Sequence, residues 1–459
     1  MTKSAWTKYN QEGMKEIFDF CEDYKKYISD CKTERECTLE AIEIAKKYGY
    51  RDLEEVIAAN ETLKPGDKVY ANNRDKNIAL FHIGQDYLNN GMAILGAHID
   101  SPRIDLKQIP LYEDTEIALL DTHYYGGIKK YQWVATPLAI HGIVVKKDGT
   151  SINVVIGEDE NDPVFGITDL LIHLAGKQMQ KTAATVIEGE DLNLTIGSIP
   201  LEGAEKEAAK ANVKKMLEEK YGIEEDDFIS AEIEIVPAGK ARDLGLDRGM
   251  IMGYGHDDRV CGYTSLRAIL DLKETPNRTA CCILCDKEEV GSNGNTGMHS
   301  RFFENVVAEL LECCGGYSDL KLRRCLTKSV MLSSDVSAGY DPNYPGVFER
   351  KNAAYLGHGL ALNKYTGARG KSGCNDANPE YIAHLRQIMD EAGISWQTAE
   401  LGRVDEGGGG TIAGILGNLN MNVIDAGVPV HNMHAPWEVV SKVDVYEAMK
   451  GYMVFLLKA

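Results

Sequence analysis

The chain has 459 residues, of which 44% are hydrophobic and 26% are charged. This is the profile of a globular protein, and its length predicts two or three domains rather than one core. A formal net charge of -20 and a pI of about 5.1 argue against nucleic acid or an anionic membrane as the main partner.

Two observations bear on the compartment. The polar N-terminal residues lack the apolar core of a signal peptide, and no apolar run approaches the roughly 18 residues that span a bilayer. The 11 cysteines are therefore expected to be reduced thiols of a cytoplasmic protein.

The residues up to about 60 are expected to be helical. Thr33 and Glu36 have the spacing of a capping box, and Gly49 follows the apolar run where a helix commonly ends. Strand patterns follow at 68–84 and 91–102. The second is an apolar run that ends in polar residues, as a buried strand does.

Residues from about 108 to 240 have a different sequence pattern, which predicts a small β-rich domain. Asp148 and Gly149 lie between two β-branched runs, the signal of a hairpin. A short helix is expected over 167–180, a polar helix near 203–220 and a strand at 231–237.

Beyond residue 240, strands and helices alternate. Strands are expected at 279–285, 328–335, 394–400 and 421–427, and helices at 300–314, 377–393 and 443–459. This alternation predicts an α/β fold, a mixed sheet with helices on both faces. We expect a catalytic domain of residues 1–107 and 241–459, interrupted by the β-rich domain at 108–240.

Metal-binding side chains recur where these strands end, and in such sheets ligands bind at the carboxyl ends of strands. They are His98, Asp100, Asp257, Asp258, Glu288, Glu289, Asp335 and His434. Each one alone is commonly structural, but together they form a mixed nitrogen and oxygen set. Such a set suits Zn²⁺, Mn²⁺ or Co²⁺ rather than Ca²⁺, and one shared ligand would allow two ions.

The order of the motifs HIDSP, HDDRV, DKEEVGS, SSDVSAGYDPNY and MHAPWE closely resembles the aspartyl aminopeptidase family of di-zinc metalloaminopeptidases. The resemblance runs nearly end to end and includes Tyr125-Gly126-Gly127, the segment 170-LLIHL-174 and GGGTIAG from Gly408. It implies a zinc exopeptidase-like catalytic domain that hydrolyses the N-terminal residue from peptides.

The resemblance also implies the role of each metal-binding residue. His98 and Asp335 would bind one zinc ion, Glu289 and His434 the other, and Asp257 would bridge them.

Two catalytic roles follow from the same resemblance. Glu288 would be the general base that takes a proton from the attacking water. Asp100 would hydrogen-bond the ring of His98 and fix its tautomer. Substrate contacts are expected at His173, Tyr365, His358 and Gly409. His173 also has a plainer interpretation, a packed core or interface histidine, and His123, His256, His358 and His431 can be structural neighbours of the motifs.

The family removes N-terminal Asp or Glu, which requires a cation in the specificity pocket. This chain departs from the family there. His358 stands in the place of the family's lysine, seven positions before the matching Tyr365, and 133-WVATPLAIHG-142 replaces a tryptophan-rich segment. An acidic preference is therefore only one possibility. Other residues could supply the charge, namely Lys364, Arg369, Lys371 and Arg403.

The three cysteines of TACCILC, namely Cys281, Cys282 and Cys285, allow two interpretations. A structural zinc site needs four ligands, whereas reduced cysteine in an apolar run behaves as a small hydrophobic residue. We expect the cysteines to pack, as we do for Cys313 and Cys314.

The resemblance implies that the inserted domain mediates dimerisation and assembly into a dodecamer whose active sites face inward, with peptides as substrates. The alternatives are another co-catalytic di-zinc hydrolase, such as a leucyl or glutamyl aminopeptidase or an N-acyl amino acid amidohydrolase, and a catalytically inactive assembly protein. Neither nucleic acid nor a membrane is expected as a partner.

Overall fold

The computed structural model describes residues 3–459, which pack as two compact units. The first unit comprises Met1–Ser101, Ala241–Met433 and Glu438–Ala459. The second unit comprises Pro102–Lys240 and the short segment His434–Trp437.

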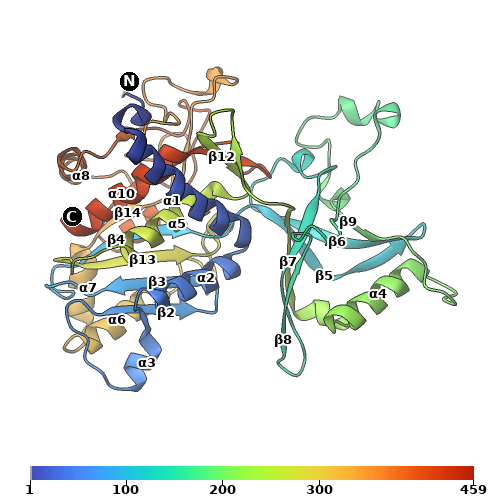
Figure 1. The fold of residues 1–459 in the computed structure, drawn as a ribbon, viewed down its shortest axis with the longest axis horizontal. Coiled ribbons are helices and arrows are strands. Elements are labelled where there is room, and N and C mark those ends of the chain that lie inside the picture. The colour runs from blue at the N-terminus through green and yellow to red at the C-terminus, as the bar shows by residue number, and fades with distance from the viewer. Residues whose placement is uncertain (1–2) are drawn as a thin grey trace. The chain divides into compact units, whose positions relative to one another are not determined.

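The first unit is built on a nine-stranded mixed sheet (Figure 1). Its strands, in spatial order, are β1 (Arg51–Asp52), β2 (Lys68–Asn73), β3 (Asn77–His82), β13 (Thr279–Cys285), β4 (Met92–His98), β14 (Val330–Ser333), β18 (Asn422–Gly427), β16 (Leu360–Asn363) and β17 (Trp396–Thr398). The four central strands β13, β4, β14 and β18 are parallel to one another. Their carboxyl ends therefore lie along the same edge of the sheet.

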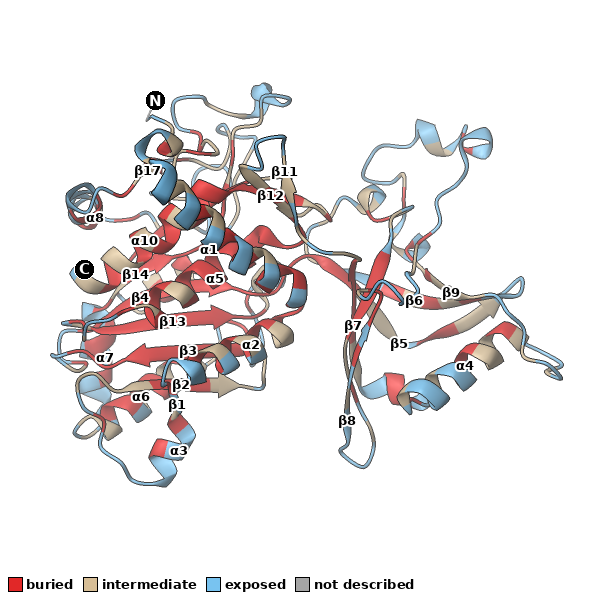
Figure 2. Ribbon diagram, in the orientation of Figure 1, coloured by how far each residue is buried: buried red, intermediate tan, exposed pale blue. Residues whose placement is uncertain are grey.

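Helices cover both faces of this sheet, as the alternating pattern predicts. One core packs the sheet against α1 (Gln11–Asp30), α2 (Glu34–Lys47), α5 (His256–Leu270), α8 (Pro379–Glu391) and α10 (Lys442–Lys458). The other core packs it against α3 (Leu53–Ala58), α6 (Phe302–Cys313), α7 (Asp319–Lys328) and α9 (Ala413–Gly417). Figure 2 shows the sheet as a buried layer.

Strand β13 shows why its cysteines pack. Cys282 lies in the first core and Cys281 and Cys285 in the second, because neighbouring side chains of a strand face opposite sides. All three are fully buried and free, which confirms the packing interpretation.

A smaller five-stranded sheet completes the first unit. Its strands are β11 (Arg242–Leu244), β12 (Met250–Gly253), β20 (Glu438–Ser441), β19 (Pro429–His431) and β15 (Ser337–Ala338). Strand β12 leads into α5, so this sheet sets the starting point of that helix.

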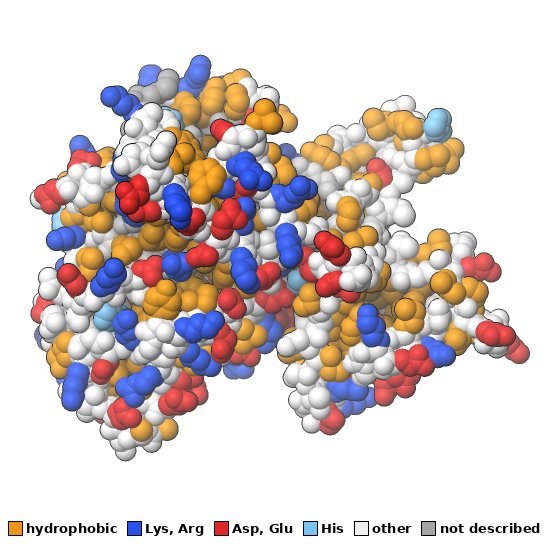
Figure 3. All heavy atoms as spheres, viewed as in Figure 1, with side chains coloured by type: hydrophobic (Ala, Val, Ile, Leu, Met, Phe, Trp, Pro, Cys, Tyr) orange, Lys and Arg blue, Asp and Glu red, His pale blue; other side chains and the backbone are white. Residues whose placement is uncertain are grey.

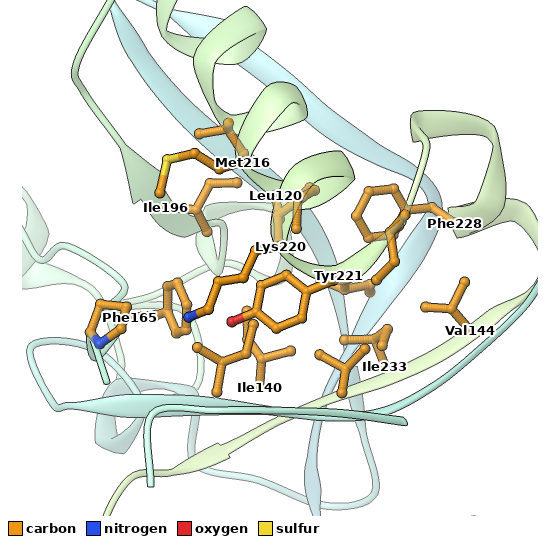
Figure 4. A pocket seen from close by; sticks show the side chains of 17 residues that line it. Leu120, Ile140, Val144, Phe165, Ile196, Met216, Lys220, Tyr221, Phe228 and Ile233 are labelled. Carbon is orange, nitrogen blue, oxygen red and sulfur yellow. The ribbon is translucent and has the colours of Figure 1, made fainter. Parts of the chain in front are cut away.

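The second unit contains a six-stranded antiparallel sheet. Its strands, in spatial order, are β8 (Ser151–Ile156), β7 (Leu138–Val145), β10 (Ala231–Pro237), β5 (Arg103–Asp114), β6 (Ile117–Tyr125) and β9 (Leu194–Gly197). The predicted hairpin around Asp148 is confirmed as the β7–β8 pair. Helix α4 (Ala208–Tyr221) covers an apolar cavity of about 150 Å³, into which Figure 4 shows Met216 and Tyr221 facing strand residues such as Ile140.

Two local expectations can be compared with the structure. The capping box of Thr33 and Glu36 is confirmed at the start of α2. The helix predicted over 167–180 is wrong, because this segment forms only two short 3₁₀ turns, Ile172–Leu174 and Gln178–Gln180. Most of its apolar side chains are exposed, namely those of Leu170, Leu171, Ile172, Leu174 and Met179, so the segment buries too little apolar surface to stabilise a longer helix.

The surface is charged and mixed in sign. On the face seen in Figure 3, the basic and acidic side chains are interspersed. None of the helices formed by residues 3–459 is long and apolar enough to cross a membrane.

Candidate metal centre

The parallel strands bring three of the predicted ligands, His98, Glu289 and Asp335, to one edge of the large sheet. His98 is the last residue of β4 and pairs in register with Cys285, the last residue of β13. The 3₁₀ turn Glu288–Val290 follows β13, and Asp335 follows β14 by two residues. Because β13 and β14 flank β4 on either side, their loops lie on both sides of His98.

Two groups of donor atoms meet at His98. One combines His98 with Asp258 and Asp335, and the other combines it with Asp257 and Glu289. Within each group the donor atoms lie within 4.8 Å of one another. The imidazole Nε2 of His98 is 3.2 Å from a carboxylate oxygen of Asp257.

The backbone fixes the tautomer of His98. Its Nδ1 lies 2.9 Å from the carbonyl oxygen of Asp100, which can only accept, so Nδ1 carries the hydrogen. In the neutral ring, Nε2 then presents its lone pair toward Asp257, which is the form that binds a metal. The carboxylate of Asp100 lies further away, 3.4 Å from the same nitrogen.

The carboxylate of Asp100 makes a second connection, to the turn after β13. Its two oxygens accept the backbone N–H groups of Glu288 and Glu289 at 3.1 and 3.2 Å. Asp100 is fully buried. It therefore joins the end of β4 to the turn that carries both glutamates.

The electrostatics of this cluster favour a cation. Burial, together with the neighbouring Asp257, raises the pKa of Asp258 well above its ordinary value, although His98 opposes the rise. Burial and the charge of Asp258 raise the pKa of Asp335 in the same direction. Burial lowers the pKa of His98, but hydrogen bonds to Asp100 and Asp257 outweigh it and raise the pKa overall. Crowded buried carboxylates of this kind repel one another unless a positive charge lies between them.

These residues fit zinc. The donor set is one imidazole nitrogen and several carboxylate oxygens, which are zinc ligands. The Oδ1 atom of Asp258 is buried and makes no hydrogen bond within the part of the chain that the structure describes. A buried carboxylate oxygen without a hydrogen-bond donor is expected where a metal ion takes that place.

A cleft of about 570 Å³ adjoins the cluster within the first unit. Glu288 and Glu289 line it on one side, and Gly410, Thr411 and Gly414 line it from the glycine-rich segment. The carboxylate of Glu288 also reaches to 4.0 Å from Nε2 of His98. The carboxylate of Glu288 and a cleft of this size thus lie beside the candidate metal ligands.

The remaining predicted site residues are His434, His173, Tyr365, His358 and Gly409. His434 packs with the second unit, where its Nδ1 lies 2.8 Å from the carbonyl oxygen of Gly127, and its role as a ligand stays a prediction. His173 is exposed in a 3₁₀ turn of that unit. In the first unit, the hydroxyl of Tyr365 donates to Glu400 at 2.6 Å, and His358 packs against the ring of Tyr355.

Of these predicted substrate contacts, Gly409 is nearest in sequence to the cleft, next to Gly410. Tyr365 and His358 are absent from its lining among residues 3–459. Their proposed contact with a substrate stays a prediction.

Two residues of the centre received no role from the sequence. Asp258 was among the candidate metal-binding side chains but received no role of its own, yet its carboxylate accepts the backbone N–H of His98 at 3.3 Å and belongs to one donor group. Glu438 accepts the backbone N–H of Asp257 at 2.9 Å. The adjacent acids did indicate Asp258 as a candidate, but no local signal indicates the contact of Glu438 with a residue 181 positions away.

Known proteins share this architecture. The family described as aminopeptidase I zinc metalloprotease (M18) matches residues 27–456. A relative from Clostridium acetobutylicum, named probable M18 family aminopeptidase 1, is 63% identical over 455 residues, 99% of this chain and 98% of the relative.

Solved structures agree. That of an M18 aminopeptidase from Thermotoga maritima has a TM-score of 0.95 at 44% identity and covers 100% of both chains. That of aminopeptidase I from Clostridium acetobutylicum has a TM-score of 0.92 at 61% identity and covers 99% of this chain and 98% of the other. The chain therefore belongs to the aminopeptidase I family of zinc metalloproteases (M18) and is a metallopeptidase.

Proposed function

We propose that this M18 aminopeptidase removes single N-terminal residues from peptides with the help of two zinc ions per chain. One observation carries the two-ion proposal. The carboxylate of Asp257 lies within 4.8 Å of donor atoms of both His98 and Glu289, which the resemblance assigns to different ions. A carboxylate in that place is suited to bridge them.

The first ion would be held by His98 and Asp335, and the second by Glu289 and His434, with Asp257 shared. The buried carboxylate of Asp258 supports the first site. When bound, zinc supplies Lewis-acid chemistry, which makes water more acidic and polarises a peptide carbonyl. Mn²⁺ or Co²⁺ would suit the same donor set.

The protein's own residues then supply positioning and proton transfer. The carboxylate of Glu288 lines the cleft and is placed to take a proton from the attacking water. After the peptide bond breaks, the same group can pass that proton to the leaving amine. The carboxylate of Asp100 accepts the backbone N–H of Glu288 and so fixes the backbone position from which the Glu288 side chain extends.

A direct test combines metal analysis with Glu288→Gln. Zinc-loaded wild-type protein should contain about two ions per chain and release N-terminal residues. Glu288→Gln should keep the ions and lose about 10²–10⁴-fold in kcat. One ion per chain would refute the two-ion proposal, and full activity of the variant would refute the role of Glu288.

The structure bears on the acidic preference. Lys364 and Lys371 both pair with Asp376, and Arg403 pairs with Glu406. Three of the four cations that could have read an acidic side chain thus already have a carboxylate partner, and two of them share the single carboxylate of Asp376. An acidic preference therefore stays a prediction, tested with peptides that begin with Asp, Glu, Leu or Lys. A preference for Leu would exclude it, while cleavage confined to N-acyl amino acids would indicate an amidohydrolase.

We further propose that the second unit mediates assembly from dimers into a dodecamer in the cytoplasm. Its segment around His173 supports this proposal, because Leu170, Leu171, Ile172 and Leu174 are exposed. Exposed apolar patches of this kind are common at protein interfaces. A single species of the 50.6 kDa chain mass in sedimentation would contradict assembly.

A further inference from the structure

The backbone that carries Asp257 and Asp258 is irregular. Both residues lie at the start of α5 but have non-helical backbone angles, and Gly255 before them has φ +69°. Such a segment cannot satisfy its own backbone hydrogen-bonding groups through helical bonds. Side chains from other parts of the first unit do so instead.

Glu438, at the start of β20, supplies the first of these contacts. Its carboxylate accepts the backbone N–H of Asp257 at 2.9 Å, and the side chain is almost fully buried. Hydrogen bonds to a buried ionised group are roughly twice as strong as neutral ones. Glu438 therefore holds the N–H side of the peptide that carries the proposed bridging ligand.

Tyr24, on α1, supplies the second contact. Its hydroxyl lies 2.6 Å from Nδ1 of His256, the residue before Asp257. Both side chains are fully buried and their rings pack 5.7 Å apart. Helix α1 lies far from the metal centre in sequence, but through Tyr24 it fixes the residue next to a ligand.

Two more side chains hold the same segment. Ser101 donates to the carbonyl of Asp257 at 2.7 Å, and the buried guanidinium of Arg259 donates to the carbonyls of Tyr254 and Gly255 at 2.7 and 3.1 Å. Hydrogen bonds thus hold the segment 254–257 at a backbone N–H, at its backbone carbonyls and at the side chain of His256.

We propose that Tyr24 and Glu438 are positioning residues of the metal centre, which fix the segment 254–257 so that Asp257 and Asp258 meet His98 before a metal binds. Neither residue is among the proposed ligands, and neither lines the cleft among residues 3–459. The inference rests on the proposed metal-dependent function. Residues that orient metal ligands in this way typically contribute about 10–100-fold to metal affinity.

The test compares Tyr24→Phe and Glu438→Gln with two matched controls in the full-length protein. Tyr50→Phe also removes a buried tyrosine hydroxyl of the first unit, one that bonds the carbonyl of Ile269. Glu447→Gln also neutralises a buried carboxylate that accepts a backbone N–H, that of Ser395. Zinc affinity is measured on metal-free protein by competition with a chromophoric chelator, and the thermal midpoint of metal-free protein reports folding.

We expect Tyr24→Phe and Glu438→Gln to bind zinc about tenfold more weakly than wild type, while both controls keep wild-type affinity. In zinc-saturated enzyme, the loss of activity of the two variants should appear as a lower kcat with an unchanged KM, since neither side chain contacts a substrate. Thermal midpoints should fall no further than in the controls.

Unchanged zinc affinity in both variants, or a loss equal to that of the controls, would overturn the proposal. This outcome is distinct from a failure of the proposed function. That failure would appear as wild-type protein that binds zinc but releases no N-terminal residue, and the affinity comparison would still decide the role of Tyr24 and Glu438.

Discussion

Replacing Asp100 with asparagine should weaken the connection between the end of β4 and the turn that carries Glu288 and Glu289. The buried carboxylate accepts two backbone N–H groups, those of Glu288 and Glu289, with one oxygen each. Asparagine offers one oxygen and one NH₂ group, so one N–H of the turn loses its acceptor. A buried donor left unpaired costs about 1–3 kcal/mol, and the remaining bond loses its charge assistance.

This cost should appear both in folding and in zinc affinity. If the turn no longer presents Glu289 correctly in the metal-free protein, about 1–3 kcal/mol corresponds to a loss of about 5- to 150-fold in zinc affinity. Urea unfolding of metal-free protein, followed by circular dichroism, measures the first effect. Competition with a chelator measures the second.

Asp444→Asn is the matched control. Its buried carboxylate also accepts two backbone N–H groups, those of Gly357 and Gly359 at 2.6 Å each, but it holds no proposed ligand. This control should lower the free energy of unfolding and leave zinc affinity unchanged. Wild-type zinc affinity in Asp100→Asn would refute the role given to this carboxylate.

Three further predictions concern single side chains. Glu289→Gln should lose zinc, whereas Glu288→Gln should keep zinc and lose turnover. Metal analysis and kinetics of both variants measure this, and equal loss of zinc from the two would contradict the assigned roles. Gly255→Ala should unfold at a much lower temperature than the control Gly49→Ala. Both glycines have positive φ, but only at Gly255 would an added Cβ atom come within 1.8 Å of the Arg259 side chain. Equal melting temperatures would contradict this prediction. Burial raises the pKa of Asp425 from 3.8 to about 6, so the folded protein holds this proton more tightly than the unfolded chain and loses about 2 kcal/mol of stability as pH rises from 4 to 7. Asp425→Asn should lack that loss in urea unfolding, and an unchanged pH dependence would refute it.

Periodicity and apolar runs were sufficient for much of the fold. The apolar run 279–285 predicted a buried strand, and β13 has those bounds. Its flanking loop carries Glu288 and Glu289, as expected for a strand that ends at the ligand-binding edge. The motif order also indicated the M18 family, which the comparisons confirm.

Long-range contacts account for what the sequence could not predict. Helix α5 was not expected, because almost all of its residues are buried and it has no polar face to give a helical period. The segment 167–180 misled in the opposite way, since its apolar spacing looks helical although most of its apolar side chains are exposed. Tyr24 and Glu438 reach the centre through hydrogen bonds that join residues 232 and 181 positions apart.

A metal centre built on His98 and Asp257 should make this chain an aminopeptidase. Release of N-terminal residues from a peptide panel, measured before chelation, after chelation and after zinc is restored, tests it most directly. We expect activity that disappears with the metal and returns when about two zinc ions per chain are bound. Activity that survives complete removal of metal, or a zinc-loaded protein that cleaves no peptide, would contradict it.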